Sequence, residues 1–443
     1  MIFIIFLICI ILIVQKWYRI IPIYVIASIW INPDVRLGHF SFITILSIFI
    51  IVYGFIKKKE LLTYKSSIDK NINNFFSYSI LIYIPFILLG TDLGILAHIG
   101  SAKNIIAILV GLIIWKSNIT NSQIKRDIPI INISLIILGI LGIYSYLTLS
   151  NPFIEIIQPY CSIENLNEIA ENSLKDQRGQ LQGRISGTSL YTIQYAILLV
   201  ITFFYIFSSK AFQKKTLIVY SILFLLLTNI YFTGSRGPLG ALIIVTCLYI
   251  IKQVPKKKII IYSIPVLFLY FIFSNTINEV YSLFGQSDEI NGSSIEGRFI
   301  QFAGALSLVI NNPQSLLFGR GLGFTGYYLT TFGPHPLALA FESAHVGGLV
   351  EYGILGLLFI YLGKFIFLLY LAQKAQKANL ITNKQSYILK LYLLAGIIYT
   401  LLVGEVYSNF YIITFFIILK YNVISNTIPK KKKNGNINYN NQL

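Results

Sequence analysis

Residues 128–148 read IPIINISLIILGILGIYSYLT and contain no Asp, Glu, Lys or Arg. A helix that crosses a hydrocarbon core of about 30 Å needs roughly 20 predominantly apolar residues. Only helices and closed barrels satisfy their backbone hydrogen bonds inside a bilayer, and this stretch lacks the alternation of a barrel strand. Residues 128–148 therefore predict a transmembrane helix.

Similar apolar stretches recur along the whole chain. Hydrophobic residues make up 56% of the 443 residues and charged residues only 12%, with a mean hydropathy of +0.72. Because an ordinary soluble domain has roughly 25% charged residues, we predict an all-α fold, a polytopic integral membrane helical bundle of about 12–13 spans. The second stretch is the weakest, and the stretches lie near residues 2–15, 20–31, 40–56, 75–90, 98–115, 128–148, 189–208, 216–232, 238–251, 259–274, 346–370, 388–403 and 408–421.

These stretches group into three sets of membrane helices, separated by two long loops and followed by a tail. Loops of more than about 15 residues in a compact protein are usually functional or disordered. Both loops carry apolar residues, glycines and aromatics, so we expect ordered, functional segments, whereas the tail is rich in Lys and Asn and predicts disorder. The helices are expected at 1–148, 189–274 and 346–421, the loops at 149–188 and 275–345, and the tail at 422–443.

The charges fix the expected orientation. The net charge is +18, and most lysines lie in short clusters between apolar stretches. Such clusters are typical of cytoplasmic loops, so we expect no nucleic-acid partner. With Lys57–Lys59 placed inside, the alternation of spans puts the other lysine clusters inside and both long loops outside.

The same alternation places all four histidines and six of the eight arginines outside. Topology gives no reason to favour Arg there, but Arg binds phosphate or pyrophosphate with two parallel hydrogen bonds. We therefore predict an anionic substrate at the outer face. The alternative is that a few arginines scatter by chance in a lysine-rich chain. The outer arginines are Arg36, Arg178, Arg184, Arg236, Arg298 and Arg320.

Motifs in the second long loop point to chemistry. Residues 296–309 predict an amphipathic helix that contains Arg298 and ends at the Asn-Asn-Pro of residues 311–313. Residues 317–323 (LFGRGLG) form a turn that either is simply flexible or lets its backbone approach a ligand. Residues 342–356 (ESAHVGGLVEYGILG) place His345 at the outer mouth of a span.

His345 is a candidate base because imidazole accepts a proton near neutral pH. The alternative is an interfacial histidine bonded to a backbone carbonyl. Glu342 and Glu351 are candidate bases or orienting partners of His345, and Glu351 lies a little under two turns further along the predicted span. Glu351 and Lys364 are the main charged residues within the spans, and both are expected near span ends.

Two shorter motifs occupy other outer helix ends. Residues 184–189 (RISGTS) precede one span, and residues 233–238 (TGSRGP) form a tight hairpin between two spans. Hydroxyls and N–H groups at a helix start help an arginine to bind an anion. The alternative is that Arg184 and Arg236 reach towards lipid headgroups.

The order of these motifs over residues 180–370 resembles the O-antigen polymerase and ligase superfamily. Val346 follows the histidine where the family often has Asn, which favours the polymerase (Wzy-type) branch over the ligase branch. The resemblance implies a GT-C-like membrane glycosyltransferase in the bacterial inner membrane, with its active site on the periplasmic or extracellular side. It would join oligosaccharide repeats linked to undecaprenyl pyrophosphate into O-antigen, capsule or another exopolysaccharide.

The resemblance also implies roles for the outer residues. Arg184, Arg236 and Arg298 would bind the pyrophosphate with help from Arg320, and His345 would act as base or orient the acceptor. Tyr327 and Tyr328 would stack on sugar rings. No Asp-x-Asp motif lies on the outer side, and the three cysteines lie far apart, so we expect no metal and no cofactor. The expected partners are lipid-linked donor and acceptor, membrane lipids, a chain-length regulator and a flippase.

Two other functions stay open from the sequence. A ligase of the same superfamily would move finished glycan to a different acceptor. A flippase or exporter of lipid-linked oligosaccharide would move it without catalysis and should carry charges along a path through the membrane. The scarcity of charges within the spans weighs against transport.

Overall fold

The protein is mostly helical, as the sequence predicts. The computed structural model describes residues 2–31, 35–37, 40–57, 67–89, 103–157, 172, 174–175, 183–209, 212, 216–253, 295–338, 340–402, 404 and 408–426. Within these ranges the strands form one antiparallel ladder of two residues each, which pairs Arg36–Leu37 (β1) with Phe40–Ser41 (β2).

The helices follow the apolar stretches closely. In the N-terminal part they are α1 (Ile2–Gln15), α2 (Ile20–Trp30) after a 3₁₀ turn (Trp17–Arg19), α3 (Phe42–Ile56), α4 (Ser67–Leu89), α6 (Lys103–Lys116), α7 (Asn121–Thr148) and α8 (Pro152–Ile157). In the rest of the chain they are α10 (Thr192–Ser208), α11 (Thr216–Phe232), α12 (Arg236–Gln253), α15 (Ile295–Val309), α16 (Pro313–Phe318), α17 (Phe324–Phe332), α18 (Ala344–Gly356), a π-helical segment (Leu357–Leu362), α19 (Gly363–Lys377), α20 (Asn383–Leu402) and α21 (Ser408–Asn426).

Two helical stretches of the described chain are both long enough and apolar enough to cross a membrane. They are Asn121–Thr148 and Ala344–Lys377, and several shorter apolar helices accompany them. The predicted stretch at 259–274 lies outside the described residues. The count of about 12–13 spans therefore stays a prediction.

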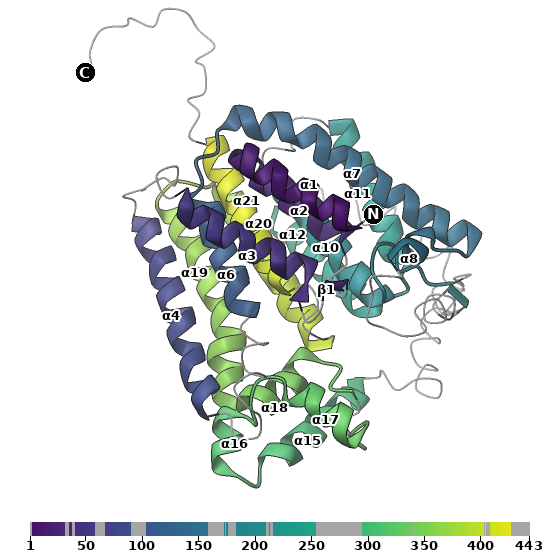
Figure 1. Ribbon diagram of the computed structural model, residues 1–443, viewed down its shortest axis with the longest axis vertical. Helices are drawn as coiled ribbons and strands as arrows, with labels where there is room; N and C mark the ends of the chain where they lie inside the picture. The colour runs from purple at the N-terminus through teal and green to yellow at the C-terminus, as the bar shows by residue number, and fades with distance from the viewer. Residues whose placement is uncertain are drawn as a thin grey trace, which may run out of the picture.

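Helix α21 lies inside the bundle, packed along α6 and next to α20 (Figure 1). Its residues from Phe415 to Leu419 are all fully buried. The helix runs to Asn426, so the predicted start of the tail at residue 422 is wrong. Asn422 is fully buried and donates a hydrogen bond to the Ser208 carbonyl at 3.1 Å, which holds this last turn in the helix. Residues 427–443 lie outside the described chain.

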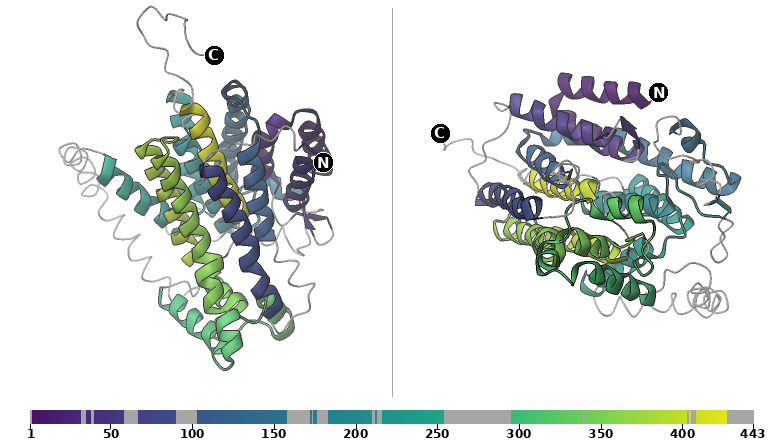
Figure 2. Two further views of the ribbon diagram at one scale, coloured as in Figure 1. Left: turned by 90° about the vertical axis from the view of Figure 1, so that its left-hand side faces the viewer. Right: turned by 60° about the horizontal axis from the view of Figure 1, so that its bottom comes forward.

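Helices α15–α18 form a separate group at one end of the bundle, which we call the helical cap (Figures 1 and 2). A small core that includes Val309, Phe324, Val346 and Leu349 holds these helices together. The predicted loop at 275–345 is thus, from residue 295 onward, a packed helical unit. The expected helix at 296–309 is present as α15, and Asn312 caps the start of α16 by accepting a hydrogen bond from the Gln314 N–H at 2.9 Å.

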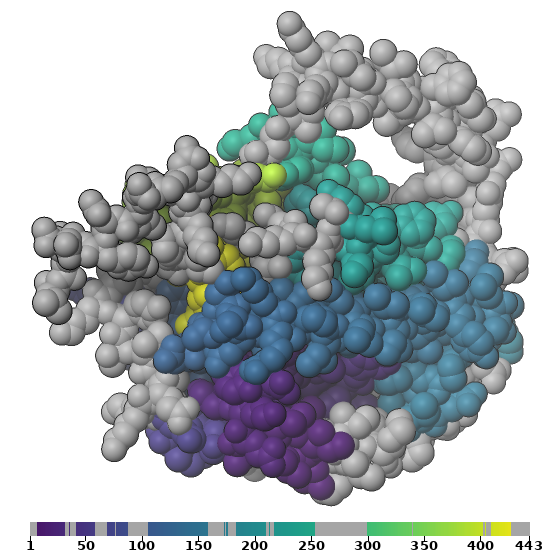
Figure 3. Space-filling view, turned by 90° about the horizontal axis from the view of Figure 1, so that it is seen from above, coloured from purple at the N-terminus to yellow at the C-terminus, as the bar shows by residue number. Residues whose placement is uncertain are grey.

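Helices α1, α2 and α7 lie side by side at the end opposite the cap (Figure 3). The Trp30 indole donates a hydrogen bond to the Ser134 hydroxyl at 2.7 Å and so ties α2 to α7. On the other side of α7, the Asn229 amide of α11 donates to the Gly139 carbonyl at 3.0 Å. Buried polar side chains of this kind fix the register between apolar helices because each needs a partner.

The predicted span at 346–370 is not one straight helix. At Gly353 the backbone takes φ 65° and ψ −169°, which breaks α18. Residues 344–352 belong to the cap, and the helix resumes at 354 and continues to Lys377. At 1.5 Å per residue this second part is roughly 36 Å long. Lys364 lies near the middle of this second part, whereas the sequence predicts it near a span end.

Candidate functional site

Arg184 connects the two short motifs predicted at outer helix ends. Its side chain is only 7% exposed. Nε donates a hydrogen bond to the Thr233 carbonyl at 3.0 Å, and a terminal nitrogen donates to the Thr192 hydroxyl at 2.6 Å and to the Ser235 hydroxyl at 3.5 Å. The guanidinium therefore holds the 233–235 turn against the start of α10.

The backbone around Arg184 supports the same contact. The Ile185 N–H donates to the Phe232 carbonyl at the end of α11, at 3.2 Å. The Asn151 amide donates to the Ser186 hydroxyl at 3.1 Å and to the Gly187 carbonyl at 2.9 Å. The first long loop is thus anchored at both edges. Asn151 is a positioning residue that sequence reasoning missed, because a lone Asn carries no motif.

Arg236 is the first residue of α12 and is partly exposed, with Pro238 in the first turn as predicted. Helix α12 packs antiparallel to α20. The Tyr387 hydroxyl near the start of α20 donates to the Leu248 carbonyl at 2.9 Å, and the Lys252 ammonium lies 4.3 Å from the Tyr387 ring centre. The start of α12 therefore lies at the end of the bundle where α20 finishes.

The cap joins the bundle at that same end. The Ser343 hydroxyl donates to the Thr400 carbonyl in the last turns of α20 at 3.5 Å. Ser343 is also the N-cap of α18 and accepts a hydrogen bond from the His345 N–H at 3.2 Å. His345, Arg236 and the Arg184 contact thus lie at one end of the molecule, although they are widely separated in the sequence.

The His345 ring lies against Tyr361, with 4.8 Å between the ring centres. Tyr361 is 1% exposed and belongs to the π-helical segment, beyond the break at Gly353. The Lys364 ammonium also packs on Tyr361, 4.3 Å from the centre of that ring. Sequence reasoning did not find Tyr361, since the π-helical turn that aims it towards His345 has no sequence signal.

Glu351 binds the glycine-rich turn that the sequence singled out. The Gly321 N–H donates to the Glu351 carbonyl at 3.2 Å, and the Thr325 hydroxyl donates to its carboxylate at 2.5 Å. A Cβ on Gly319 would lie 2.2 Å from the Glu351 carbonyl oxygen. Close contact between two backbones therefore explains Gly319, and Thr325 of α17 holds the Glu351 carboxylate.

Arg320 points into the cap. Its Nε donates to the Leu308 carbonyl at 2.6 Å, and its guanidinium lies 5.3 Å from the centre of the Phe324 ring. These contacts do not bring it to Arg184. Its expected contribution to binding the pyrophosphate stays a prediction.

Glu342 lies beside α15. Its carboxylate is exposed and accepts a hydrogen bond from the Gln301 amide at 3.5 Å. Arg298 belongs to α15, three residues before Gln301. Its side chain lies outside the described part of the structure.

Tyr327 is 44% exposed on α17, within a group of aromatic side chains. Its ring packs edge-on against Phe332 at 6.4 Å and near Phe324 at 6.1 Å. Tyr328 is less exposed and contacts Phe341. The arrangement leaves the Tyr327 side chain accessible for stacking on a ligand.

Among the described residues, no three His, Cys, Asp or Glu side chains lie together as a metal site would require. Of the other outer residues, His39, His98 and Arg178 fall outside the described side chains. No model of a known protein family matches the chain, and no curated protein is significantly similar to it.

Proposed function

We propose that the chain is a polytopic membrane glycosyltransferase. It joins oligosaccharide repeats carried on undecaprenyl pyrophosphate at the outer face of a bacterial inner membrane. The expected product is an O-antigen, capsule or other exopolysaccharide. A growing glycan leaves its lipid pyrophosphate and bonds to a hydroxyl of the next lipid-linked repeat, whose proton is taken by a base.

One observation carries the proposal. Motifs spread over residues 184–351 gather at one end of the helical bundle. Arg184 is bonded to the turn that precedes Arg236, and the antiparallel packing of α12 and α20 brings that turn to the end where Ser343 meets Thr400. Arginines at this end would offset the negative charge that develops on a leaving diphosphate, and a histidine there would take the acceptor proton.

The distribution of basic residues supports the orientation. At the end of the bundle away from the cap, Lys252 packs on the Tyr387 ring and Lys384 packs on the Tyr249 ring. At the end with the cap lie Arg236, Arg320 and His345. Lysine on the inner side is the pattern expected of a membrane protein, and arginine on the opposite side suits an anionic substrate.

The roles follow from chemistry and position. Arg236 and Arg298 bind the leaving pyrophosphate and offset its developing charge. Arg184 fixes the turn that presents Arg236. His345 accepts the acceptor proton or orients the acceptor, with Glu342 as a second candidate base. Tyr327 stacks on a sugar ring.

Deletion of the gene tests the proposal. The glycan ladder of the deletion strain is expected to collapse to single repeats on their normal acceptor. Loss of all glycan from the acceptor, with polymer accumulating on the lipid carrier, would instead identify a ligase.

A flippase is the second candidate, because Lys364 lies in the middle of the helix 354–377 and not at its end. Deletion of a flippase would leave lipid-linked repeats on the inner leaflet. Accumulation of that kind would contradict the polymerase.

Arg236→Lys tests the pyrophosphate contact. Lysine keeps the charge but cannot form two parallel hydrogen bonds. Polymerisation by purified protein should fall by about 10²-fold or more, since one lost donor at a developing charge costs that much. Arg298→Lys is expected to cause the same loss of polymerisation. Unchanged polymerisation in both variants would remove the two arginines from the site.

A further inference from the structure

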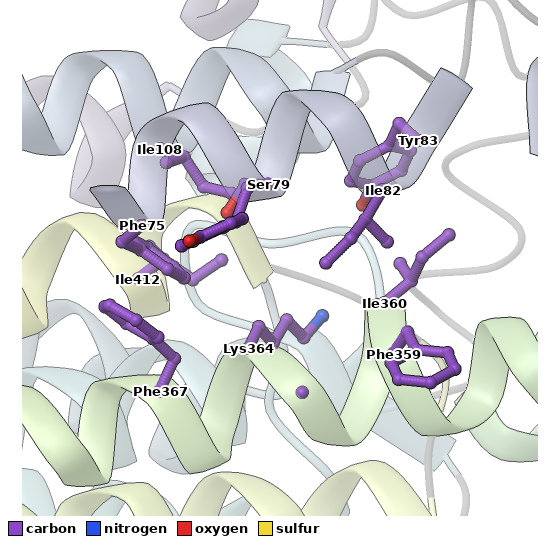
Figure 4. A pocket seen from close by; sticks show the side chains of 12 residues that line it. Phe75, Ser79, Ile82, Tyr83, Ile108, Phe359, Ile360, Lys364, Phe367 and Ile412 are labelled. Atoms are coloured by element: carbon purple, nitrogen blue, oxygen red, sulfur yellow. The ribbon is translucent and has the colours of Figure 1, made fainter. Parts of the chain in front are cut away.

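A pocket with a single cation opens between α4 and the helix 354–377. The cavity is about 110 Å³ and is lined by apolar side chains of α4, α6, the π-helical segment, α19 and α21, together with Lys364. Figure 4 shows Lys364 extending from α19 into the space below Ser79 and Tyr83 of α4. None of the described lining residues is acidic.

The pocket opens sideways. Tyr78 and Phe359 at its rim are 57% and 55% exposed, while Phe75 and Ile108 deeper inside are 4% exposed. In a bundle that spans a membrane, such a lateral opening faces the hydrocarbon chains of the bilayer. Apolar walls with few polar groups are usual in ligand sites, but these are roughly 300–1,000 Å³. At about 110 Å³ this cavity takes only a short segment of a lipid chain.

Lys364 lies three residues beyond Tyr361 in the long helix that follows the break at Gly353. It comes roughly 16 Å along the helix from Gly353, at 1.5 Å per residue. Its ammonium lies 4.3 Å from the Tyr361 ring centre and 5.5 Å from that of Phe365. An ionisable residue within an apolar helix of a membrane protein marks a functional site.

The pocket lies beside the candidate site. Tyr361, on which Lys364 packs, is the residue that contacts His345. Tyr83 and Ile360 of the pocket also share a small core with Leu322 of the glycine-rich turn. An anion held by Lys364 would therefore lie next to the group that the proposed reaction uses.

We infer that this pocket binds the part of the isoprenoid chain next to the phosphate of the lipid-linked substrate, with Lys364 attracting that phosphate. The inference rests on the proposed function for the identity of the lipid. The lateral opening lets the chain enter from the bilayer, and the contact from Lys364 through Tyr361 to His345 leads from the chain to the reacting end.

Photo-crosslinking tests the pocket directly. The probe is undecaprenyl phosphate with a diazirine on its isoprenoid chain, added to the full-length protein in phosphatidylcholine nanodiscs. Adducts mapped by mass spectrometry should fall on α4 and α19 near Phe75 and Phe367. Undecaprenyl phosphate should compete with the probe about tenfold better than undecaprenol, the effect of one favourable charge contact. It should also compete better than phosphatidylglycerol, which has a phosphate but no isoprenoid chain.

Lys364→Met should lower the adduct yield about tenfold, since it removes the charge but keeps the aliphatic stem. Lys374→Met is the matched control, because Lys374 lies on the same helix and packs on Tyr370 at 5.2 Å, away from the pocket. Ile82→Trp, which fills the pocket and leaves Lys364 in place, should also reduce labelling. Unchanged labelling in Lys364→Met, or equal competition by phosphatidylglycerol, would overturn the inference.

Polymerisation measured on the same samples separates the two proposals. If the wild type polymerises repeats and Lys364→Met does so equally well with unchanged labelling, the pocket is wrong and the function stands. If labelling depends on Lys364 but the wild type forms no polymer, the pocket stands and the function is wrong.

Discussion

At the scale of single residues, Arg184 shows how a predicted ligand-binding residue becomes part of the scaffold. The sequence places it at an outer helix end, which is compatible with direct binding of an anion. In the structure its guanidinium donates to Thr233, Thr192 and Ser235. A buried arginine with these partners holds two segments together, and any effect on substrate passes through the turn that precedes Arg236.

Substitution of Arg184 should therefore lower stability as well as activity. Arg184→Met leaves the Thr233 carbonyl without this donor, and Arg184→Lys cannot reach all three acceptors from one ammonium. We expect a loss of about 1–3 kcal/mol for Met and less for Lys, measured as thermal unfolding of the purified protein in detergent.

Arg126→Lys is the control for this experiment, because Arg126 is exposed and packs on the Tyr18 ring at 5.1 Å. Its stability should change by less than about 0.5 kcal/mol. Equal stability of the Arg184 and Arg126 variants would show that the buried contacts contribute nothing.

At the scale of elements, the break in α18 decides the geometry of the site. Apolar periodicity predicts a continuous span, since glycine is tolerated inside membrane helices. The structure places Gly353 in a conformation that is essentially restricted to glycine, and its Cα faces the Gly319 N–H and the Leu317 carbonyl. Two glycines from distant segments therefore define where the cap ends and the long helix begins.

Gly353→Ala should disrupt this junction. The added Cβ would lie 2.6 Å from backbone atoms of the cap, and the backbone conformation alone costs about 1–3 kcal/mol in a non-glycine residue. The expected result is a lower unfolding temperature and loss of polymerisation.

Gly326→Ala within the cap is the matched control, because a Cβ there meets nothing within 4 Å. In a helix interior this change should be neutral or stabilise by up to about 1 kcal/mol. If Gly353→Ala were as stable as Gly326→Ala, the break would not be a fixed feature of the fold.

At the scale of the whole molecule, the proposal requires the cap to face outward. In a variant with Cys9, Cys161 and Cys247 replaced by serine, Thr331→Cys in the cap should react with a membrane-impermeant maleimide added to intact spheroplasts. Ala378→Cys, in the turn between α19 and α20, should react only after permeabilisation. The reverse pattern would place the proposed site in the cytosol and end the proposal.

The sequence by itself determined the helical class of the protein, the positions of most helices and the motifs that carry charge. Periodicity, caps and apolar length are local properties, so they can be recognised in one chain without a structure. The amphipathic helix at 296–309 and the hairpin before Pro238 are examples that the structure confirms.

Only the tertiary structure decided which of these motifs meet. Arg184 contacts Thr233, and Glu351 contacts both the glycine-rich turn and Thr325, although these partners lie in separate segments. His345 meets Tyr361 across the break at Gly353. The break at Gly353 and the contact of Lys364 with Tyr361 also arise from packing. Each of these contacts depends on how closely two segments of the chain pack together. Side chains on both segments set that distance, so no single stretch of sequence determines the contact.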